Sequence, residues 1–306
     1  MPKLSTNKFV KLFFFGNYFY GVCAVALSIE GALQQHYPLN DLLYYVLAFS
    51  STIVYYTNAY ILTEVSDDIA NIRSMWYARN KRFMMGNQLF FLLVALFCGG
   101  IFLIKRWESI LALNGMEWFL LLIFPLVSTF YYGVDSKVFG KINLRNVGWL
   151  KPFIIGFTWA GLANIYPILY SCIDNGQHYH PTLVGGFLFL KNFMFITILC
   201  IMFDIKDYAM DYNAQLKTVV VKLGLRRTIF YFIIPLCFIG LGSFLIYAMA
   251  QHFSTLKILI NTIPFILIIT VAYSMYSRRS IFYYLIIIDG LMLVKALCGI
   301  TAMTFF

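Results

Sequence analysis

Nine long apolar segments follow one another along the chain, and they constrain its fold more than any other feature. A bilayer core about 30 Å thick is crossed by about 20 residues of α-helix. The segments are 9–34, 42–65, 88–106, 117–134, 150–172, 182–203, 228–250, 256–274 and 281–304. We interpret residues 107–116 as a loop. The pattern predicts an all-α membrane protein, a bundle of nine transmembrane helices that forms one domain over residues 1–306.

The composition excludes a water-soluble fold. Of the 306 residues, 61% are hydrophobic and 12% are charged, whereas soluble domains carry about 25% charged residues. So few polar groups cannot cover the surface of a water-facing globule. Soluble, disordered and disulfide-stabilised secreted proteins are therefore excluded.

Basic residues predict how the chain crosses the membrane. Of the 23 Lys and Arg residues, 18 fall in alternate connections, at 1–11, 66–87, 135–151, 204–227 and 278–279. The opposite connections hold three, Lys105, Arg106 and Lys257. Because cytoplasmic loops carry the excess of Lys and Arg, we expect a cytoplasmic N-terminus. The net charge of +10 then reports topology, and we expect no nucleic-acid partner. The first apolar run is longer than the core of a signal peptide, so we interpret it as a span.

Six of the 13 acidic residues fall in two short windows, at the cytoplasmic ends of the second and sixth spans. The first window holds Glu64, Asp67 and Asp68, and the second holds Asp204, Asp207 and Asp211. Glu64, Asp67 and Asn71 have the spacing i, i+3, i+7, and the three aspartates of the second window repeat it. On a helix this spacing keeps the side chains within an arc of about 60°. Each helix end therefore presents a stack of oxygen ligands on one face.

Carboxylates stacked on one helix face repel each other and are costly near a bilayer. Lys206 projects to the opposite face from the aspartates, so we expect a divalent metal cation, and not a lysine, to compensate their charge. Hard oxygen ligands suit Mg²⁺. The predicted metal ligands are Glu64, Asp67, Asn71, Asp204, Asp207 and Asp211. The alternative is that these are ordinary acids solvated at the membrane interface.

Basic residues follow both acidic windows. They are Arg73, Arg79, Lys81 and Arg82 after the first, Lys217, Lys222, Arg226 and Arg227 after the second, and Lys137, Lys141 and Arg145 between them. A diphosphate needs this combination, with Mg²⁺ on its oxygens and Lys or Arg covering the remaining charge. Each base taken alone is equally well explained by its role in topology.

The second window resembles a motif of the UbiA superfamily of intramembrane prenyltransferases. Members of that family carry D-x-x-D-x-x-x-D, then Lys-Thr, a β-branched run and Leu-Gly. This chain has Asp204, Asp207 and Asp211, followed by Lys217-Thr218-Val219-Val220-Val221-Lys222-Leu223-Gly224. The resemblance covers about 50 residues as motifs and nearly the whole chain as topology.

The first window departs from the corresponding family motif, N-D-x-x-D-x-x-x-D. Here it reads Thr63-Glu64-x-x-Asp67-x-x-x-Asn71, so only Asp67 is unchanged. The family's N-R-P-x-x-x-G resembles the stretch from Asn80 to Gly86, which keeps the Asn, a base at Lys81 and the Gly but has no proline. The family's Y-x-x-x-K is out of register, because Tyr132 and Lys137 are five residues apart.

The resemblance implies a central cavity that admits a polyprenyl diphosphate, and transfer of the prenyl group to an aromatic or other lipophilic acceptor. It implies catalytic roles for Asp67, Asp204, Asp207 and Asp211 and diphosphate binding by Lys81, Lys137 and Lys217. The site would face the cytoplasm. If the source is bacterial, the protein would lie in the cytoplasmic membrane. Naphthoate, benzoate, homogentisate, haem and glycerol phosphate remain open as acceptors. A terpene cyclase on the same scaffold and a non-catalytic binder or transporter of a phosphorylated lipid are the alternatives.

Polar residues inside the spans are expensive when they face lipid. We therefore expect Asn17 and Glu30 to face the bundle. We expect Asp289 to pair with Lys191 on the sixth span, because Lys295 lies about 120° away from Asp289 on its own helix. Aromatic faces stabilise cations, so some aromatic side chains are expected to stabilise a carbocation. The candidates, chosen by their depth in the spans, are Tyr18, Tyr20, Tyr132 and Trp159.

Overall fold

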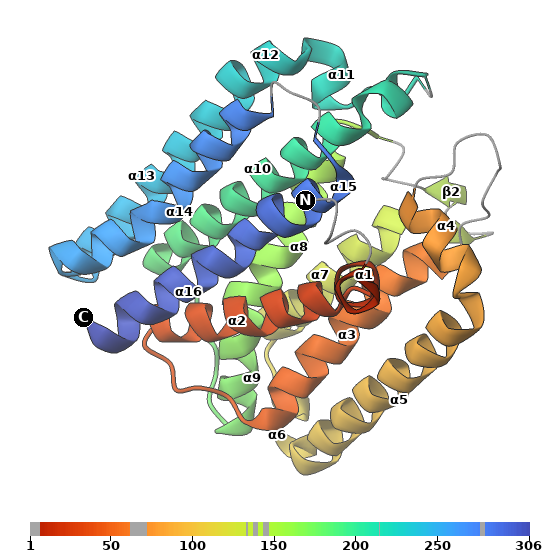
Figure 1. Cartoon of the computed structure of the whole chain (residues 1–306). Helices are drawn as coiled ribbons and strands as arrows, with labels where there is room; N and C mark the ends of the chain where they lie inside the picture. Colours follow the sequence, from red (N-terminus) through yellow and green to blue (C-terminus); the bar gives the residue numbers. More distant parts are fainter. Residues whose placement is uncertain are drawn as a thin grey trace.

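The computed structural model describes residues 7–61, 72–132, 134–136, 140–142, 147–213, 215–275 and 279–306. Over these residues the chain is a bundle of helices with one short antiparallel strand pair (Figure 1). The first half contains α1 (Lys8–Phe15), α2 (Tyr18–Gln34), α3 (Leu42–Ile61), α4 (Ile72–Arg79), α5 (Lys81–Lys105), α6 (Trp107–Leu111), α7 (Gly115–Tyr132), β1 (Val134–Ser136) and β2 (Gly140–Ile142). The second half contains α8 (Lys151–Asn164), α9 (Tyr166–Asp174), α10 (Leu183–Asn213), α11 (Val219–Leu223), α12 (Leu225–Thr228), η4 (Ile229–Ile233), α13 (Ile234–Ala250), α14 (Thr255–Ser274), α15 (Ile281–Tyr283), η5 (Tyr284–Ile288) and α16 (Gly290–Phe305).

A helix lies at each of the nine segments expected from the sequence. Within the described part of the chain, six helical stretches are long and apolar enough to cross a bilayer, and a seventh is added when the bent pair of α1 and α2 counts as one span. The apolar part of α7 is shorter, and α3 contains several hydroxyl side chains that lower its hydropathy. The multi-pass membrane architecture is thus established, while the number nine and the cytoplasmic N-terminus stay predictions.

Residues 107–116, expected as a loop, instead contain α6 and the start of α7. Ile110 of α6 is buried against Ile168 and Leu169 of α9, and this apolar contact stabilises a helical turn too short to be recognised by periodicity. The start of α7 is closed by a reciprocal cap. Asn114 Oδ1 accepts from the Glu117 amide at 2.9 Å, and Glu117 Oε2 accepts from the Asn114 amide at 2.8 Å.

The helices bend where the sequence disturbs the backbone hydrogen bonds. The axes of α1 and α2 meet at 56°, around Asn17, which has the left-handed φ of 66°. The break between α8 and α9 falls just before Pro167. The π-helical turn η4 precedes Pro235, which has no amide hydrogen to donate to the preceding turn.

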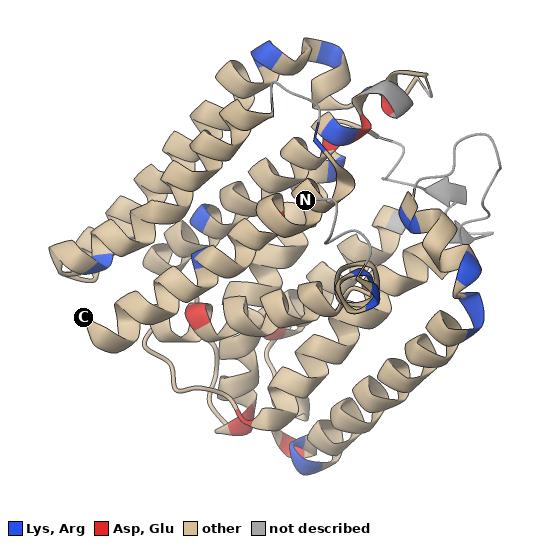
Figure 2. Cartoon of the chain, in the orientation of Figure 1, with Lys and Arg blue, Asp and Glu red and all other residues tan. Residues whose placement is uncertain are grey.

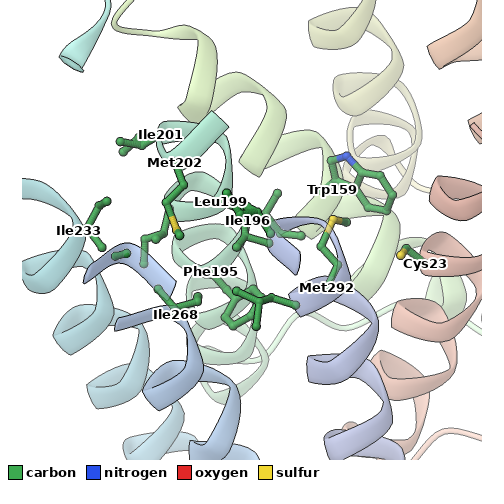
Figure 3. Close-up of a cluster of buried hydrophobic side chains, with 14 of the residues drawn as sticks. Cys23, Trp159, Phe195, Ile196, Leu199, Ile201, Met202, Ile233, Ile268 and Met292 are labelled. Carbon is green, nitrogen blue, oxygen red and sulfur yellow. The ribbon is translucent and has the colours of Figure 1, made fainter. Parts of the chain in front are cut away.

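The centre of the bundle is built around α10, which packs against α8 and α13, while α2 packs against α3, α8 and α16. Small residues let these backbones approach closely. A Cβ on Gly31 would lie 1.9 Å from the carbonyl oxygen of Ala163, and one on Gly156 would lie 2.2 Å from Thr197 Oγ1. Figure 3 shows the apolar core between these helices, with Phe195 and Leu199 of α10 facing Met292 of α16.

Helix α5 lies at the edge of the bundle, beside α3 (Figure 1). Only 6% of the most apolar stretch of α5 is buried inside the protein. Its outward face carries the exposed side chains of Leu96 and Phe97. Such an apolar outer face suits contact with lipid. Charged residues lie mainly at the ends of the helices, and the middle of most helices is uncharged (Figure 2).

Candidate active site

The second acidic window lies where α10 ends beside the start of α8; we call this end of the bundle, marked by Asp204 and Lys151, the motif end. Asp204 is fully buried, and Asp207 and Asp211 are partly buried. Basic residues gather at the same end, over α11, α12 and the junction of α4 and α5 (Figure 2). The structure therefore brings acids and bases together at the end of the bundle that carries the second acidic window.

Lysines compensate part of this negative charge, contrary to our expectation. Lys151 Nζ lies 2.9 Å from Asp204 Oδ1, and Lys206 Nζ lies 3.2 Å from Asp207 Oδ1. Helical spacing places the Lys206 backbone away from the aspartates, but its long flexible side chain reaches back to its neighbour. Lys151 was missed in the site prediction because it lies on another helix, at the first position of α8, and no pattern within α8 marks it.

Two carboxylate oxygens of the same window remain without a partner. Asp204 Oδ2 and Asp211 Oδ2 are both buried and accept no hydrogen bond within the described part of the chain. Buried polar atoms normally have a partner, and an unsatisfied one calls for a ligand or ion. Hard anionic oxygens are the donor type that Mg²⁺ prefers, so the residues present fit this ion in their chemistry.

The second window does not complete a metal site alone. Among the residues that the structure describes, no three His, Cys, Asp or Glu side chains are grouped so as to hold a metal ion. The other predicted ligands, Glu64, Asp67 and Asn71, lie outside the described residues. Magnesium binding, and the part that the altered first motif plays in it, therefore stay predictions.

Asp211 follows the last membrane-spanning turn of α10. Burial raises the pKa of its carboxyl group to about 6, although the positive charge of Lys151 acts in the opposite direction. A proton therefore competes with any cation for this carboxylate at mildly acidic pH.

The predicted diphosphate-binding lysines have different settings. Lys81 is the first residue of α5, and Lys217 precedes α11; both are exposed. A Cβ on Gly148 would lie 2.9 Å from the carbonyl carbon of Lys217, so the segment that carries Lys217 lies against the chain that leads into Lys151. Lys137 lies outside the described residues.

The aromatic side chains chosen by depth separate into two groups. Tyr20 stacks on Tyr56 with ring centroids 4.6 Å apart, and the indole nitrogen of Trp159 donates to the Tyr56 hydroxyl at 2.6 Å. Tyr18 instead donates to Asn87 Oδ1 of α5 at 2.6 Å. The side chain of Tyr132 is outside the described part of the structure. Sequence reasoning missed Tyr56, because its segment carries many tyrosines with no spacing that distinguishes one of them.

The expected pair of Lys191 and Asp289 is wrong. Lys191 Nζ lies 3.3 Å from Glu30 Oε1, and Lys295 Nζ lies 2.6 Å from Glu30 Oε2. Asp289 Oδ2 accepts from the Tyr20 hydroxyl at 2.6 Å. Lys191 precedes Asp204 by 13 residues on α10, which places it roughly 20 Å below the motif end, too deep to reach Asp289. Asn17 and Glu30 are buried in the bundle, as predicted.

These features define a multi-pass helical membrane protein with a mixed acidic and basic site at one end of the bundle. The fold is similar to that of a solved digeranylgeranylglyceryl phosphate synthase, with a TM-score of 0.57 and 13% sequence identity. The match covers 97% of this chain and 99% of that chain, so the two share a fold along essentially their whole length. No protein-family model matches the sequence, and no curated protein shows significant similarity to it.

Proposed function

We propose that this protein is an intramembrane prenyltransferase that uses Mg²⁺ and a polyprenyl diphosphate. The observation that carries the proposal is the pair of buried, unpartnered oxygens of Asp204 and Asp211 beside Lys151. They belong to the window that resembles the second motif of the UbiA superfamily. Support also comes from the fold, which is similar to that of digeranylgeranylglyceryl phosphate synthase.

The proposed metal ligands are Asp204, Asp207 and Asp211, together with Glu64, Asp67 and Asn71. When bound there, Mg²⁺ supplies charge neutralisation for the diphosphate leaving group. Lys151 holds the Asp204 carboxylate through one oxygen and leaves the other free for a ligand. Lys81, Lys137 and Lys217 bind the remaining negative charge of the diphosphate. The apolar helices around the site keep water away from the reactive allylic group.

The reaction breaks the allylic C–O bond of the prenyl diphosphate, and its electron pair leaves with diphosphate. A nucleophilic atom of the acceptor then forms a bond to the allylic carbon. Transfer rather than cyclisation is proposed because the fold is similar to that of a synthase named for a product with two geranylgeranyl groups.

The test is diphosphate release by the purified protein in lipid nanodiscs, given geranylgeranyl diphosphate, Mg²⁺ and a lipid extract of the source cells that supplies the acceptor. We expect release that stops when Mg²⁺ is chelated and a prenylated lipid in cells that carry the gene, detected by mass spectrometry of their extracts. A cyclic hydrocarbon or alcohol formed from the diphosphate alone would identify a cyclase instead. Binding without release at any Mg²⁺ concentration would identify a binder or transporter.

A further inference from the structure

Asp289 is a buried carboxylate whose surroundings differ from those of the other intramembrane acids. It is 4% exposed, and within the described part of the chain no Lys or Arg lies within ion-pair distance of it. Glu30 contacts two lysines and Asp204 contacts one. The hydrogen-bond partner of Asp289 is the Tyr20 hydroxyl. An ionisable group buried in a membrane protein without a direct ion pair is a candidate functional residue.

Asp289 lies just below the motif end. The ring of Tyr284, at the start of η5, is 5.8 Å from the ring of Phe203, the residue before Asp204. Asp289 follows Tyr284 by five residues, which places it roughly 7 Å deeper in the bundle. Asp289 therefore lies close to the motif end along the bundle.

The backbone at Asp289 is irregular. The Asp289 amide donates to the carbonyl of Tyr284 at 3.0 Å, which closes the wider loop of the π-helical turn η5. Such turns weaken a helix and often redirect a side chain at a functional site. The other π turn, η4, precedes a proline and carries only apolar and aromatic residues, whereas η5 has no proline to account for it and leads directly to the buried acid.

Aromatic rings from three other helices line up beside this carboxylate. Tyr20 of α2 stacks on Tyr56 of α3, and the Tyr56 hydroxyl accepts from Trp159 of α8. Tyr20 and Tyr56 are only partly buried, although Asp289 and Trp159 are buried. The faces of such rings stabilise a cation by about 0.5–2 kcal/mol each. Four helices thus place a proton acceptor and electron-rich rings next to each other below the diphosphate site.

We propose that Asp289 is the general base of the transfer and takes the proton that the acceptor loses; this rests on the proposed prenyltransferase function. The allylic C–O bond breaks first, and its electron pair leaves with diphosphate. The nucleophilic atom of the acceptor then forms the new bond to the allylic carbon, and the proton of that atom goes to the Asp289 carboxylate while its bonding electrons stay on the acceptor. Tyr20 is a positioning residue that orients the carboxylate through its hydrogen bond.

The experiment separates the two halves of the reaction. Wild type, Asp289→Asn and Tyr20→Phe are compared in nanodiscs for the slow Mg²⁺-dependent hydrolysis of geranylgeranyl diphosphate without acceptor, in which water bonds to the allylic carbon and diphosphate is released. The same variants are then expressed in the source cells after deletion of the gene, so that the cells supply the acceptor, and the prenylated lipid is measured. The matched control is Tyr44→Phe, which removes a buried hydroxyl that bonds to Ser28 in another part of the bundle.

We expect Asp289→Asn to keep diphosphate release within about threefold of wild type and to lose about 100-fold or more of the lipid product, the range for removal of a general base. Tyr20→Phe should lower the ratio of product to release by about 10-fold, and Tyr44→Phe should leave that ratio unchanged. A ratio as high as wild type in either Asp289→Asn or Tyr20→Phe would overturn the inference while leaving the proposed function intact.

Two further outcomes are decisive. If Asp289→Asn also loses diphosphate release, the inference is tested by Tyr20→Phe, which retains the Asp289 carboxylate. A lowered ratio of lipid product to diphosphate release in Tyr20→Phe supports the inference, and an unchanged ratio overturns it. If the wild type releases no diphosphate and deletion of the gene removes no prenylated lipid, the proposed function itself fails and the inference fails with it.

Discussion

Two groups of charged residues lie inside this bundle, and they are satisfied to very different degrees. In the Glu30 group, both carboxylate oxygens contact a lysine, and Gln34 accepts from Lys191 and donates to Asn261 at 2.8 Å. At the motif end, Asp204 and Asp211 each keep a buried oxygen without a partner in the described part of the chain. Both groups contain costly buried charge, but in only one of them does the protein itself supply the full set of partners.

The difference separates a structural role from a chemical one. The Glu30 group joins α2, α10, α14 and α16 through groups that are all less than 4% exposed, so it fixes how these helices pack. At the motif end, buried carboxylate oxygens remain available to an added ligand. Sites that bind and turn over a ligand have to keep such capacity, and they do so at a cost in stability.

The largest effect is expected for Glu30→Gln. The change leaves Lys191 and Lys295 buried without a counter-charge, and breaking a buried pair in this way costs about 3–5 kcal/mol. Thermal unfolding in nanodiscs measures the loss. Lys295→Met is the matched control, since Glu30 then still contacts Lys191, and its loss should be clearly smaller. Equal losses in the two variants would contradict a structural role centred on Glu30.

Asp207→Ala should abolish diphosphate release with little change in unfolding temperature. Asp207 is partly exposed, and its ion-pair partner among the residues that the structure describes is its neighbour Lys206, so its removal leaves no buried charge behind. Loss of a residue that supports a metal typically costs 10–100-fold, and loss of a direct ligand should cost more. Glu108→Ala removes an exposed acid on α6 and serves as the control. Full activity of Asp207→Ala would exclude this aspartate from the mechanism.

Lys81→Ala should have a smaller effect, confined to one substrate. A lysine that binds diphosphate stabilises the bound prenyl donor, so the KM for that donor should rise by about 10-fold, while the KM for the acceptor stays constant. Steady-state kinetics with each substrate varied in turn provides the measurement. Equal changes in both constants would point to a role of Lys81 in folding or topology.

The smallest effect concerns pH. Because burial raises the pKa of Asp211 to about 6, this group holds a proton at pH 5 that an exposed aspartate would have lost. A divalent cation must displace that proton, so cation affinity should fall as the pH drops below 6, by a few-fold per unit. Titration with Mn²⁺ at several pH values tests this, and Asp211→Asn should flatten the dependence. An unchanged profile in that variant would assign the dependence to another group.

The local elements were more predictable from sequence than the contacts between them. Apolar length located the helices, and the spacing of Asp204, Asp207 and Asp211 identified the motif end, because both properties belong to a single segment. Lys151, the Glu30 group and the pair of Asp289 with Tyr20 depend on which helices become neighbours and at what depth. A single sequence does not encode these in any local pattern, so the pairing of Lys191 with Asp289 was predicted wrongly.

The central claim is that the carboxylates at the end of α10 hold a divalent cation, and the most direct test is cation binding by the purified protein. Mn²⁺ replaces Mg²⁺ at hard oxygen sites and is followed by electron paramagnetic resonance. Wild type and Lys295→Met should bind Mn²⁺, and Mg²⁺ should displace it. The triple variant Asp204→Asn, Asp207→Asn, Asp211→Asn should remain folded and bind none. Binding by the folded triple variant with wild-type affinity would contradict the account.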